Sequence, residues 1–241
     1  MKVTRIFAHR GNSSCFPENT LPAFEDAVKL GASGIELDVH LTKDAQLVVI
    51  HDETLARTTN GRGWIKDLTL VEIQKFNAGG EISTKVPTLT EVLSLLVKLN
   101  FTGQLNIEIK TDIIHYTGIE EQLAEVLQSQ TWPFSLVISS FYFPSLEKMA
   151  NLMPTLDLAY LFVDEMKKAQ LAEKSAFISA LHPKISWVIQ QEKNLANYSK
   201  PIRPWTVNKE EQMTFCFQQQ VAGLFTDYPQ KAIKLSEEFN G

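Results

Sequence analysis

The sequence predicts an α/β fold built from parallel βα units, and three observations support this prediction. Short apolar runs typical of strands recur along the 241 residues, and most are followed by a segment with helical periodicity. The length fits one (β/α)8 barrel or two small domains, and 44% hydrophobic with 21% charged residues is typical of a globular chain. Neither a long linker nor a solenoid repeat interrupts the pattern. We therefore expect one domain over residues 1–241.

The predicted strands are apolar runs bounded by turn residues or charges. In chain order they are Val3–Ala8, Gly34–Val39, Gln46–His51, Gln104–Lys110, Ser135–Phe141, Leu156–Phe162, Phe177–Leu181, Ile202–Val207 and Gly223–Thr226. The predicted helices carry apolar residues three or four positions apart. They are Leu21–Leu30, Leu89–Leu99, Ile119–Gln128, Pro144–Leu152, Val163–Ala172, Ile185–Gln191, Lys209–Gln220 and Pro229–Glu238. The strands exceed the eight of a closed barrel by one, so we expect Phe177–Leu181 to be a short extra segment.

The connection between the second and third strands is unusually short. Only Lys43–Ala45 separates their apolar patterns, which is too few residues for a crossover helix. A hairpin would make the two strands antiparallel. Alternatively, residues 39–45 return in an extended conformation, since seven residues span roughly 23 Å. We favour the extended return because it leaves Asp38 and His51 at the same end of the sheet.

The stretch between His51 and Pro87 fits no βα unit. It is rich in turn residues, especially in Arg57–Trp64 and Asn77–Gly80. A long insertion at the active end of a barrel is usually functional rather than a passive loop. We predict an inserted region at about residues 52–87 that supplies either a lid or a subunit contact.

Charged side chains occupy one face of two predicted strands. Glu36 and Asp38 stand two residues apart, as do Glu108 and Lys110, and aliphatic residues occupy the opposite faces. In a barrel the apolar face packs on helices, so the charged side chains point inward. Buried carboxylates are costly unless a cation, such as a buried Arg or Lys, lies among them. Three carboxylates exceed what Lys110 alone neutralises, and all-oxygen sites suit hard ions. We therefore predict a site for Mg²⁺ or Ca²⁺.

Two histidines stand at predicted strand ends. His9 and Arg10 follow the first strand, and His51 ends the third. Two imidazoles that flank a metal can act as general base and general acid. Arg10 and Lys110 suit an anion with delocalised oxygens, such as a phosphate. Trp205, near a late strand end, forms either a pocket wall or part of the core.

The bulk composition excludes several classes of protein. The net charge of −5, from 23 basic and 28 acidic residues, argues against a nucleic-acid partner. No apolar run is long enough to span a bilayer, and the first predicted strand begins at Val3, so we expect neither a membrane span nor a signal peptide. Cys15 and Cys216 make no disulfide framework, so we expect free thiols and a cytoplasmic protein.

Further motifs complete an ordered set that spans nearly the whole chain. The set consists of His9-Arg10-Gly11, Pro17–Thr20, Glu36–Val39, His51-Asp52, Asn106–Lys110, Ser139–Phe141, Trp205–Asn208 and Thr226–Pro229. In this order the motifs resemble those of the glycerophosphodiester phosphodiesterase family. The departures are slight, because Ala45 stands where the family commonly has Gly and Ile109 where it has Leu.

The resemblance implies a TIM-type (β/α)8 barrel with a small insertion after the third strand. It implies a metal-dependent hydrolase of glycerol and lipid metabolism that cleaves glycerophosphodiesters, such as glycerophosphocholine or glycerophosphoethanolamine, to sn-glycerol 3-phosphate and an alcohol. The implied site residues are the metal ligands Glu36, Asp38 and Glu108, the base His9, the acid His51, and the substrate contacts Arg10, Lys110 and Trp205. The expected partner is a small-molecule substrate, without stable membrane insertion.

Two other functions remain open on the same barrel. A lysophospholipase D acting on lysophospholipids would need an apolar cleft near the insertion. A non-catalytic barrel that binds glycerophosphodiesters would not need both His9 and His51. The sequence also leaves open the leaving alcohol, the native metal and whether the chain forms a homo-oligomer. The nucleophile, either water or the glycerol 2-hydroxyl, is open as well.

Overall fold

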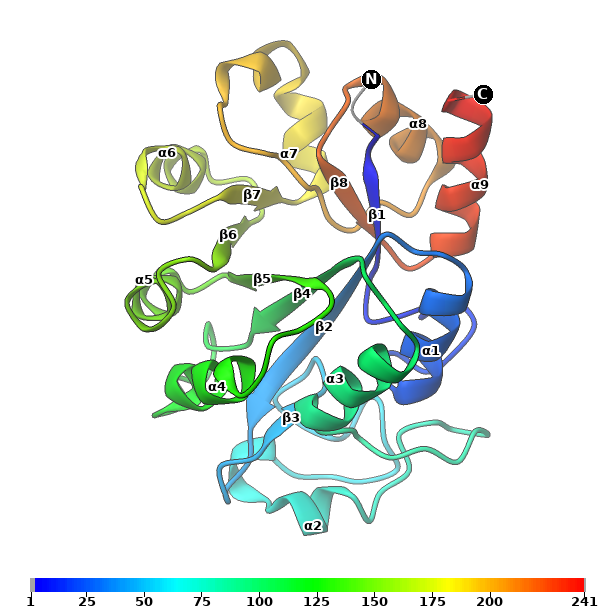
Figure 1. Cartoon of the computed structure of the whole chain (residues 1–241), viewed down its shortest axis with the longest axis vertical. Coiled ribbons are helices and arrows are strands. Elements are labelled where there is room, and N and C mark those ends of the chain that lie inside the picture. The colour runs from blue at the N-terminus through cyan, green and yellow to red at the C-terminus, as the bar shows by residue number, and fades with distance from the viewer. Residues whose placement is uncertain (1–2, 241) are drawn as a thin grey trace.

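The computed structural model describes residues 3–240, apart from the Asn240 side chain, as a barrel of strands with helices outside it (Figure 1). Neighbouring parallel strands follow the order β7-β6-β5-β4-β2-β1-β8. Their bounds are β1 Arg5–Ala8, β2 Gly34–Leu41, β4 Gln104–Ile109, β5 Ser135–Ser140, β6 Asp157–Phe162, β7 Ala180–Pro183 and β8 Gly223–Thr226. The predicted α/β fold of parallel βα units is therefore confirmed.

The barrel is completed by residues 202–207, which lie between β7 and β8. The backbone amides of Arg203 and Trp205 donate to carbonyls of β7, at 2.9 and 3.0 Å. On the other side, the amide of Val207 donates to the Phe225 carbonyl of β8 at 2.8 Å. Pro204 has no amide hydrogen to contribute to a ladder. The predicted strand at 202–207 thus occupies a barrel position without forming a regular strand.

The expectation that Phe177–Leu181 is an extra segment is wrong. Its last two residues belong to β7, which pairs with β6 from Ala180 onward and fills a barrel position. Phe177 lies before the strand, where its ring packs on Phe143 with centroids 5.4 Å apart. The apolar run therefore combines helix-packing residues with the start of a strand. The additional strand is β3, Leu47–Val49, which lies off the barrel path.

The expectation of an extended return after the second strand is also wrong. Strand β2 continues to Leu41, and β3 pairs with it antiparallel, with Val39 opposite Val49. The chain returns along β3, so the amide of Ile50 donates to the carbonyl of Asp38 at 3.1 Å. The hairpin therefore brings His51 back beside Asp38, as the sequence predicted for a different reason.

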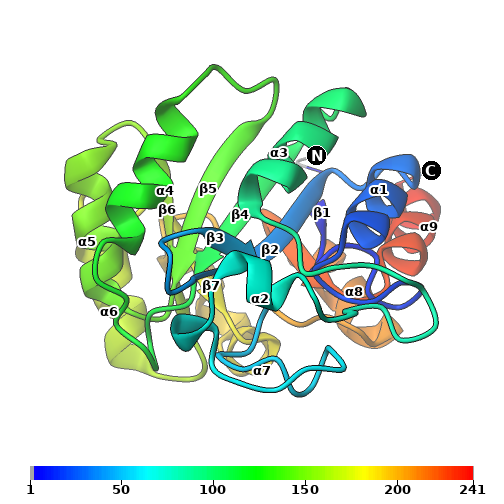
Figure 2. The same cartoon turned by 90° about the horizontal axis from the view of Figure 1, so that it is seen from below.

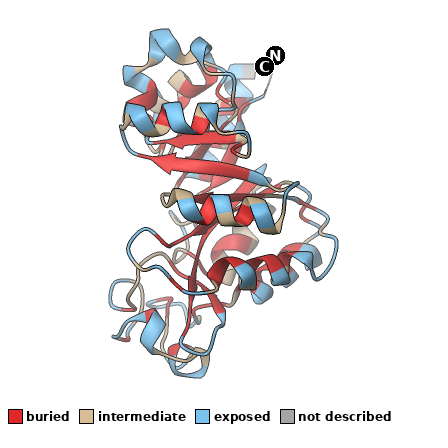
Figure 3. Ribbon diagram, turned by 90° about the vertical axis from the view of Figure 1, so that its left-hand side faces the viewer, coloured by how far each residue is buried: buried red, intermediate tan, exposed pale blue. Residues whose placement is uncertain are grey.

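Helices cover the outside of the barrel, and their apolar faces are buried while their outer faces are exposed (Figure 3). Their bounds are α1 Leu21–Lys29, α3 Leu89–Lys98, α4 Ile119–Gln128, α5 Phe143–Leu152, α6 Met166–Lys174, α7 Ile185–Gln190, η2 Glu192–Asn197, α8 Glu210–Gln218 and α9 Pro229–Asn240. The main apolar core lies between strands and helices. Ile35, Leu37 and Ile107 are fully buried in it, so the faces opposite the carboxylates point outward as predicted.

The segment after β3 forms a small layer of its own beside the barrel. It contains η1 (Ile65–Asp67) and α2 (Leu70–Ile73), which Figure 2 shows next to β3. Leu55, Ile65 and Ile73 are fully buried there and pack with Val48 of β3. This separate apolar cluster fixes the segment against β3.

Within residues 3–240, no helix combines the length and apolar character needed to cross a bilayer.

Candidate active site

A pocket lies among the carboxyl ends of the barrel strands. Acidic, basic and polar residues line it together with several apolar ones. The lining residues are His9, Arg10, Glu36, His51, Asn106, Glu108, Ser139, Phe141, Leu161, His182, Trp205, Thr206 and Phe225. Most of the predicted site residues are among them. The other two, Asp38 and Lys110, are buried and contact Arg10 and Glu108, respectively.

Three buried carboxylates form the most charged part of the site. Glu36, Asp38 and Glu108 each offer an oxygen, and these oxygens lie within 4.8 Å of one another. The parallel register of β2 and β4 causes this, because Asp38 is paired with Glu108. Burial, followed by the charges of the other two carboxylates, raises the pKa of Glu36 well above its ordinary value. Burial also raises the pKa of Glu108, to about 7. This cluster could hold a metal ion.

Two basic side chains neutralise part of this negative charge. Lys110 Nζ donates to Glu108 at 2.9 Å, and Arg10 Nε lies 3.4 Å from Asp38 Oδ2. Burial alone would raise the pKa of Asp38, but the charges of Arg10 and Lys110 lower it to about 2. The side-chain amide Nδ2 of Asn19 also donates to Asp38 Oδ2, at 2.8 Å. Asn19 belongs to the Pro17–Thr20 motif, to which the sequence assigned no role.

His9 is held by an acidic residue from the far end of the chain. Its Nδ1 lies 2.6 Å from Asp227 Oδ1, while its Nε2 lies 4.0 Å from Glu36. Burial alone would raise the pKa of Asp227, but the hydrogen bond from His9 lowers it. An ionised carboxylate only accepts, so His9 carries its proton on Nδ1 and presents Nε2 to the carboxylate cluster.

Sequence reasoning assigned no role to Asp227, although a signal was present. His9 directly follows β1 and Asp227 directly follows β8. These strands are parallel neighbours in which Ala8 is paired with Thr226. Residues that follow paired positions on neighbouring strands lie side by side, so the strand order would have predicted the contact.

His51 is held in a similar way on the other side of the pocket. Its Nδ1 lies 2.7 Å from Asp52 Oδ1, and its Nε2 lies 3.3 Å from Lys110 Nζ. Burial lowers the pKa of His51, and the charge of Asp38 opposes this effect. Since an ammonium group only donates, Nε2 is the accepting nitrogen and Nδ1 carries the proton. Both histidines thus direct Nε2 inward.

Aromatic side chains form an apolar wall of the pocket. Trp205 packs edge-on against Phe141, with ring centroids 5.4 Å apart, and its Nε1 donates to the carbonyl of His182 at 2.7 Å. Leu161 and Phe225 also line the pocket. Of the two alternatives left by the sequence, Trp205 therefore forms a pocket wall.

Comparison with known proteins finds similarity over nearly the whole chain. The model of the glycerophosphoryl diester phosphodiesterase family matches residues 9–231. A Bacillus altitudinis glycerophosphodiester phosphodiesterase is 40% identical over 244 residues, which cover 98% of this chain and 99% of the relative. The uncharacterized protein YqiK of Bacillus subtilis is 42% identical over 241 residues, covering 97% and 98% of the two chains.

A solved structure shows the same architecture. It is an Oleispira antarctica phosphodiesterase in complex with its product, sn-glycerol-3-phosphate. It is 28% identical to this chain, covers 98% of it and 97% of its own length, and superposes with a TM-score of 0.86. The predicted TIM-type barrel is thereby confirmed.

Proposed function

Because the chain belongs to the glycerophosphoryl diester phosphodiesterase family, we propose that it hydrolyses glycerophosphodiesters such as glycerophosphocholine and glycerophosphoethanolamine. Membership makes the chain a glycerophosphodiester phosphodiesterase. The proposed products are sn-glycerol 3-phosphate and an alcohol. One observation carries the proposed function. Two histidines, each with Nδ1 held by an aspartate, direct Nε2 inward beside three buried carboxylates.

We assign Glu36, Asp38 and Glu108 as the ligands of a divalent cation, Mg²⁺ or Ca²⁺. The fit rests on their clustered oxygens. It is supported by the raised pKa values of Glu36 and Glu108, which burial and the neighbouring carboxylates cause and which a bound cation would lower. Carboxylate oxygens are the ligands that both ions prefer. When bound, such an ion stabilises negative charge on phosphoryl oxygens.

The half-buried Arg10 and the buried Lys110 would bind the phosphate of the substrate. Arg10 lines the pocket and keeps its planar donors near the carboxylate cluster, while Lys110 lies between Glu108 and His51. A guanidinium matches the geometry of phosphate oxygens, and an ammonium adds a compact charge. Donors that already point at the reacting group stabilise charge developing in the transition state, and one donor contributes about 3 kcal/mol.

His9 is the proposed base, and His51 is the proposed acid. His9 Nε2 takes a proton from the attacking hydroxyl, and Asp227 stabilises the resulting imidazolium. To act as the acid, His51 must be the imidazolium, with a second proton on Nε2. It gives that proton to the alkoxide that leaves as the phosphorus–oxygen bond breaks and returns to the neutral Nδ1-protonated form, whose Nδ1 Asp52 holds. Burial lowers the pKa of His51, and the negative charge of a bound phosphodiester would offset that effect.

Release of sn-glycerol 3-phosphate from glycerophosphocholine tests the proposal directly. We expect equimolar glycerol phosphate and choline with Mg²⁺ or Ca²⁺, and no release after chelation. His9→Ala and His51→Ala should each lower the rate by about 10² to 10⁴. His115→Ala is the matched control, because His115 is exposed and contacts the ring of Tyr142 outside the pocket lining.

Two results would contradict the proposal. The absence of release from every diester with every divalent ion would favour a non-catalytic binder. Turnover of lysophosphatidylcholine without turnover of glycerophosphocholine would favour a lysophospholipase D. A cyclic phosphate seen by ³¹P NMR during turnover would identify the glycerol 2-hydroxyl, rather than water, as the nucleophile.

A further inference from the structure

Arg57, from the segment that follows β3, bridges two carboxylates at the edge of the site. Its Nε and Nη2 donate to Asp52 at 2.7 and 2.8 Å, and its Nη1 and Nη2 donate to Glu18 at 2.8 Å each. One guanidinium therefore forms a two-pronged pair with each carboxylate. Arg57 does not line the active-site pocket, and its side chain is 46% exposed.

Each of these carboxylates also holds a residue of the proposed mechanism. Asp52 Oδ1 accepts from Nδ1 of His51 at 2.7 Å. Glu18 Oε1 accepts from Nη1 of Arg10 at 2.8 Å. Arg57 is thus the common partner behind the proposed acid and behind a proposed phosphate ligand.

The charges in this chain of contacts depend on Arg57. Its hydrogen bonds are the main reason why the pKa of Asp52 lies well below its usual value. Burial alone would raise the pKa of Glu18, but the hydrogen bond from Arg57 and the charge of Arg10 lower it. Without Arg57, the like-charged carboxylates of Asp52 and Glu18 would remain close together with fewer hydrogen-bond donors. Each side chain would then move toward other partners.

We propose that Arg57 is a positioning residue that orients His51 and Arg10 together, so that the insertion acts as a fixed brace on the active site. The inference rests on the proposed function, because it names what holds the residues to which that function assigns roles. A planar guanidinium can pair with two carboxylates at once, whereas an ammonium lacks this geometry. An exposed ion pair with a purely structural role would contribute only modest stability and would leave the chemistry unchanged.

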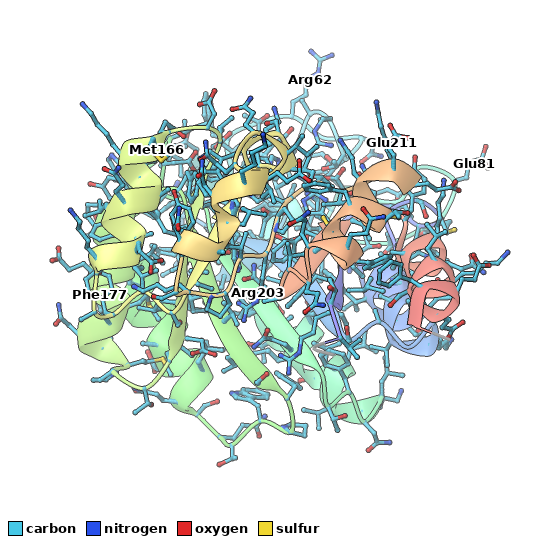
Figure 4. All side chains as sticks on the ribbon, turned by 90° about the horizontal axis from the view of Figure 1, so that it is seen from above. Arg62, Glu81, Met166, Phe177, Arg203 and Glu211 are labelled. Atoms are coloured by element: carbon cyan, nitrogen blue, oxygen red, sulfur yellow. The ribbon has the colours of Figure 1, made fainter. Side chains whose placement is uncertain are left out.

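Three variants test this role through kcat and KM with glycerophosphocholine. We expect Arg57→Met to lower kcat and raise KM, with a loss in kcat/KM of about 10- to 100-fold. Arg57→Lys keeps the charge and should remain well below wild type. Arg62→Met is the matched control, because Arg62 lies in the same segment and points away from the protein (Figure 4). Within residues 3–240, no hydrogen bond or ion pair involves Arg62.

The contacts of Arg57 through Asp52 to His51 and through Glu18 to Arg10 can be tested separately. Asp52→Asn should mainly lower kcat, since it acts through His51, and Glu18→Gln should mainly raise KM, since it acts through Arg10. Combining Arg57→Met with Asp52→Asn should lower kcat by less than the product of the single effects, because both changes act on one contact. Guanidinium ion added to Arg57→Ala should restore part of the lost rate, since the Arg57 side chain is 46% exposed.

A measurement that needs no turnover separates this inference from the proposed function. Long-range ¹H–¹⁵N correlation of the His51 ring should show the Nδ1-protonated tautomer in wild type and a mixture in Arg57→Met. If wild type hydrolyses no diester, the proposed function fails, and the tautomer still tests the brace. The brace is refuted by a wild-type tautomer in Arg57→Met, or by kcat and KM equal to those of Arg62→Met. If Arg57→Met does not fold, Arg57→Lys supplies the same comparison.

Discussion

Asp227→Asn should nearly abolish the activity without unfolding the protein. Asp227 accepts from His9 through Oδ1 and from the amide of Asn208 through Oδ2, each at 2.6 Å. The amide of Asn208 is fixed, because its oxygen accepts from the Asp227 backbone amide at 3.0 Å and from Thr226 Oγ1 at 3.2 Å. The side-chain amide introduced at position 227 must therefore turn its oxygen toward Asn208 and its NH₂ group toward His9.

The size of the expected fall in kcat follows from the His9 tautomer that this orientation of the amide imposes. An NH₂ group donates to Nδ1 of His9, so the ring proton moves to Nε2, the atom proposed to accept a proton. A wrong tautomer of this kind costs up to about 10⁴ in kcat in a serine protease. We expect kcat to fall about 10³- to 10⁴-fold, or about 4 to 5.4 kcal/mol of activation free energy.

The assay is steady-state release of sn-glycerol 3-phosphate, with thermal melting as the check on folding. A second variant tests the cause: in Asp227→Asn/Asn208→Asp, the new carboxylate accepts from the NH₂ group of residue 227. The amide oxygen of residue 227 then faces His9 again, so at least tenfold of the loss should return. A kcat within threefold of wild type in the single variant, or no recovery in the double variant, would refute the reasoning.

Three further predictions concern charge, specificity and the core. The pKa of Glu108 is about 7 in the folded protein, compared with an ordinary value of 4.5, so this carboxyl ionises less readily in the folded than in the unfolded chain. Metal-free protein should therefore lose thermal stability as the pH rises from 4.5 to about 7. Saturating Mg²⁺ should remove this loss, whereas Glu108→Gln should only reduce it, because Glu36 also has a raised pKa; an unchanged slope in both would contradict the assignment. Trp205→Ala should raise KM about tenfold, or ~1.4 kcal/mol, with little change in kcat; an unaltered KM would remove Trp205 from the substrate contacts. Leu37→Ala should lower the unfolding free energy by about 2–5 kcal/mol in urea titration, because Leu37 is fully buried; a change below 1 kcal/mol would contradict the outward packing of β2.

The inward carboxylates could be predicted from the sequence because side-chain alternation in strands is local. Glu36 and Asp38 share a face whatever the strand pairs with, and so do Glu108 and Lys110. The direction of the third strand could not be predicted in this way, since alternation is the same in parallel and antiparallel pairs. The hairpin turn was also difficult to predict from the sequence. Ala45 adopts a φ of 55° there, a left-handed value for which Gly is the usual signal.

The residues that orient the site could not be predicted, because spacing carries no information about distant contacts. Asp227 is 218 positions from His9, and Arg57 is 39 positions from Glu18. Asp227 required the strand order to be known. Arg57 lies in a turn-rich stretch without periodicity, where a charged residue is ordinarily solvated.

The contact between His9 and Asp227 depends on two strands that lie at opposite ends of the sequence. It joins the first and last strands of the barrel, which pair over Arg5–Ala8 and Gly223–Thr226. A growing chain can form the β2–β3 hairpin early because that contact is local, but the proposed base stays unsupported until β8 leaves the ribosome and docks on β1. The support of His9 therefore depends on the pairing of β1 with β8, which is the last pair of parallel strands that a growing chain can complete.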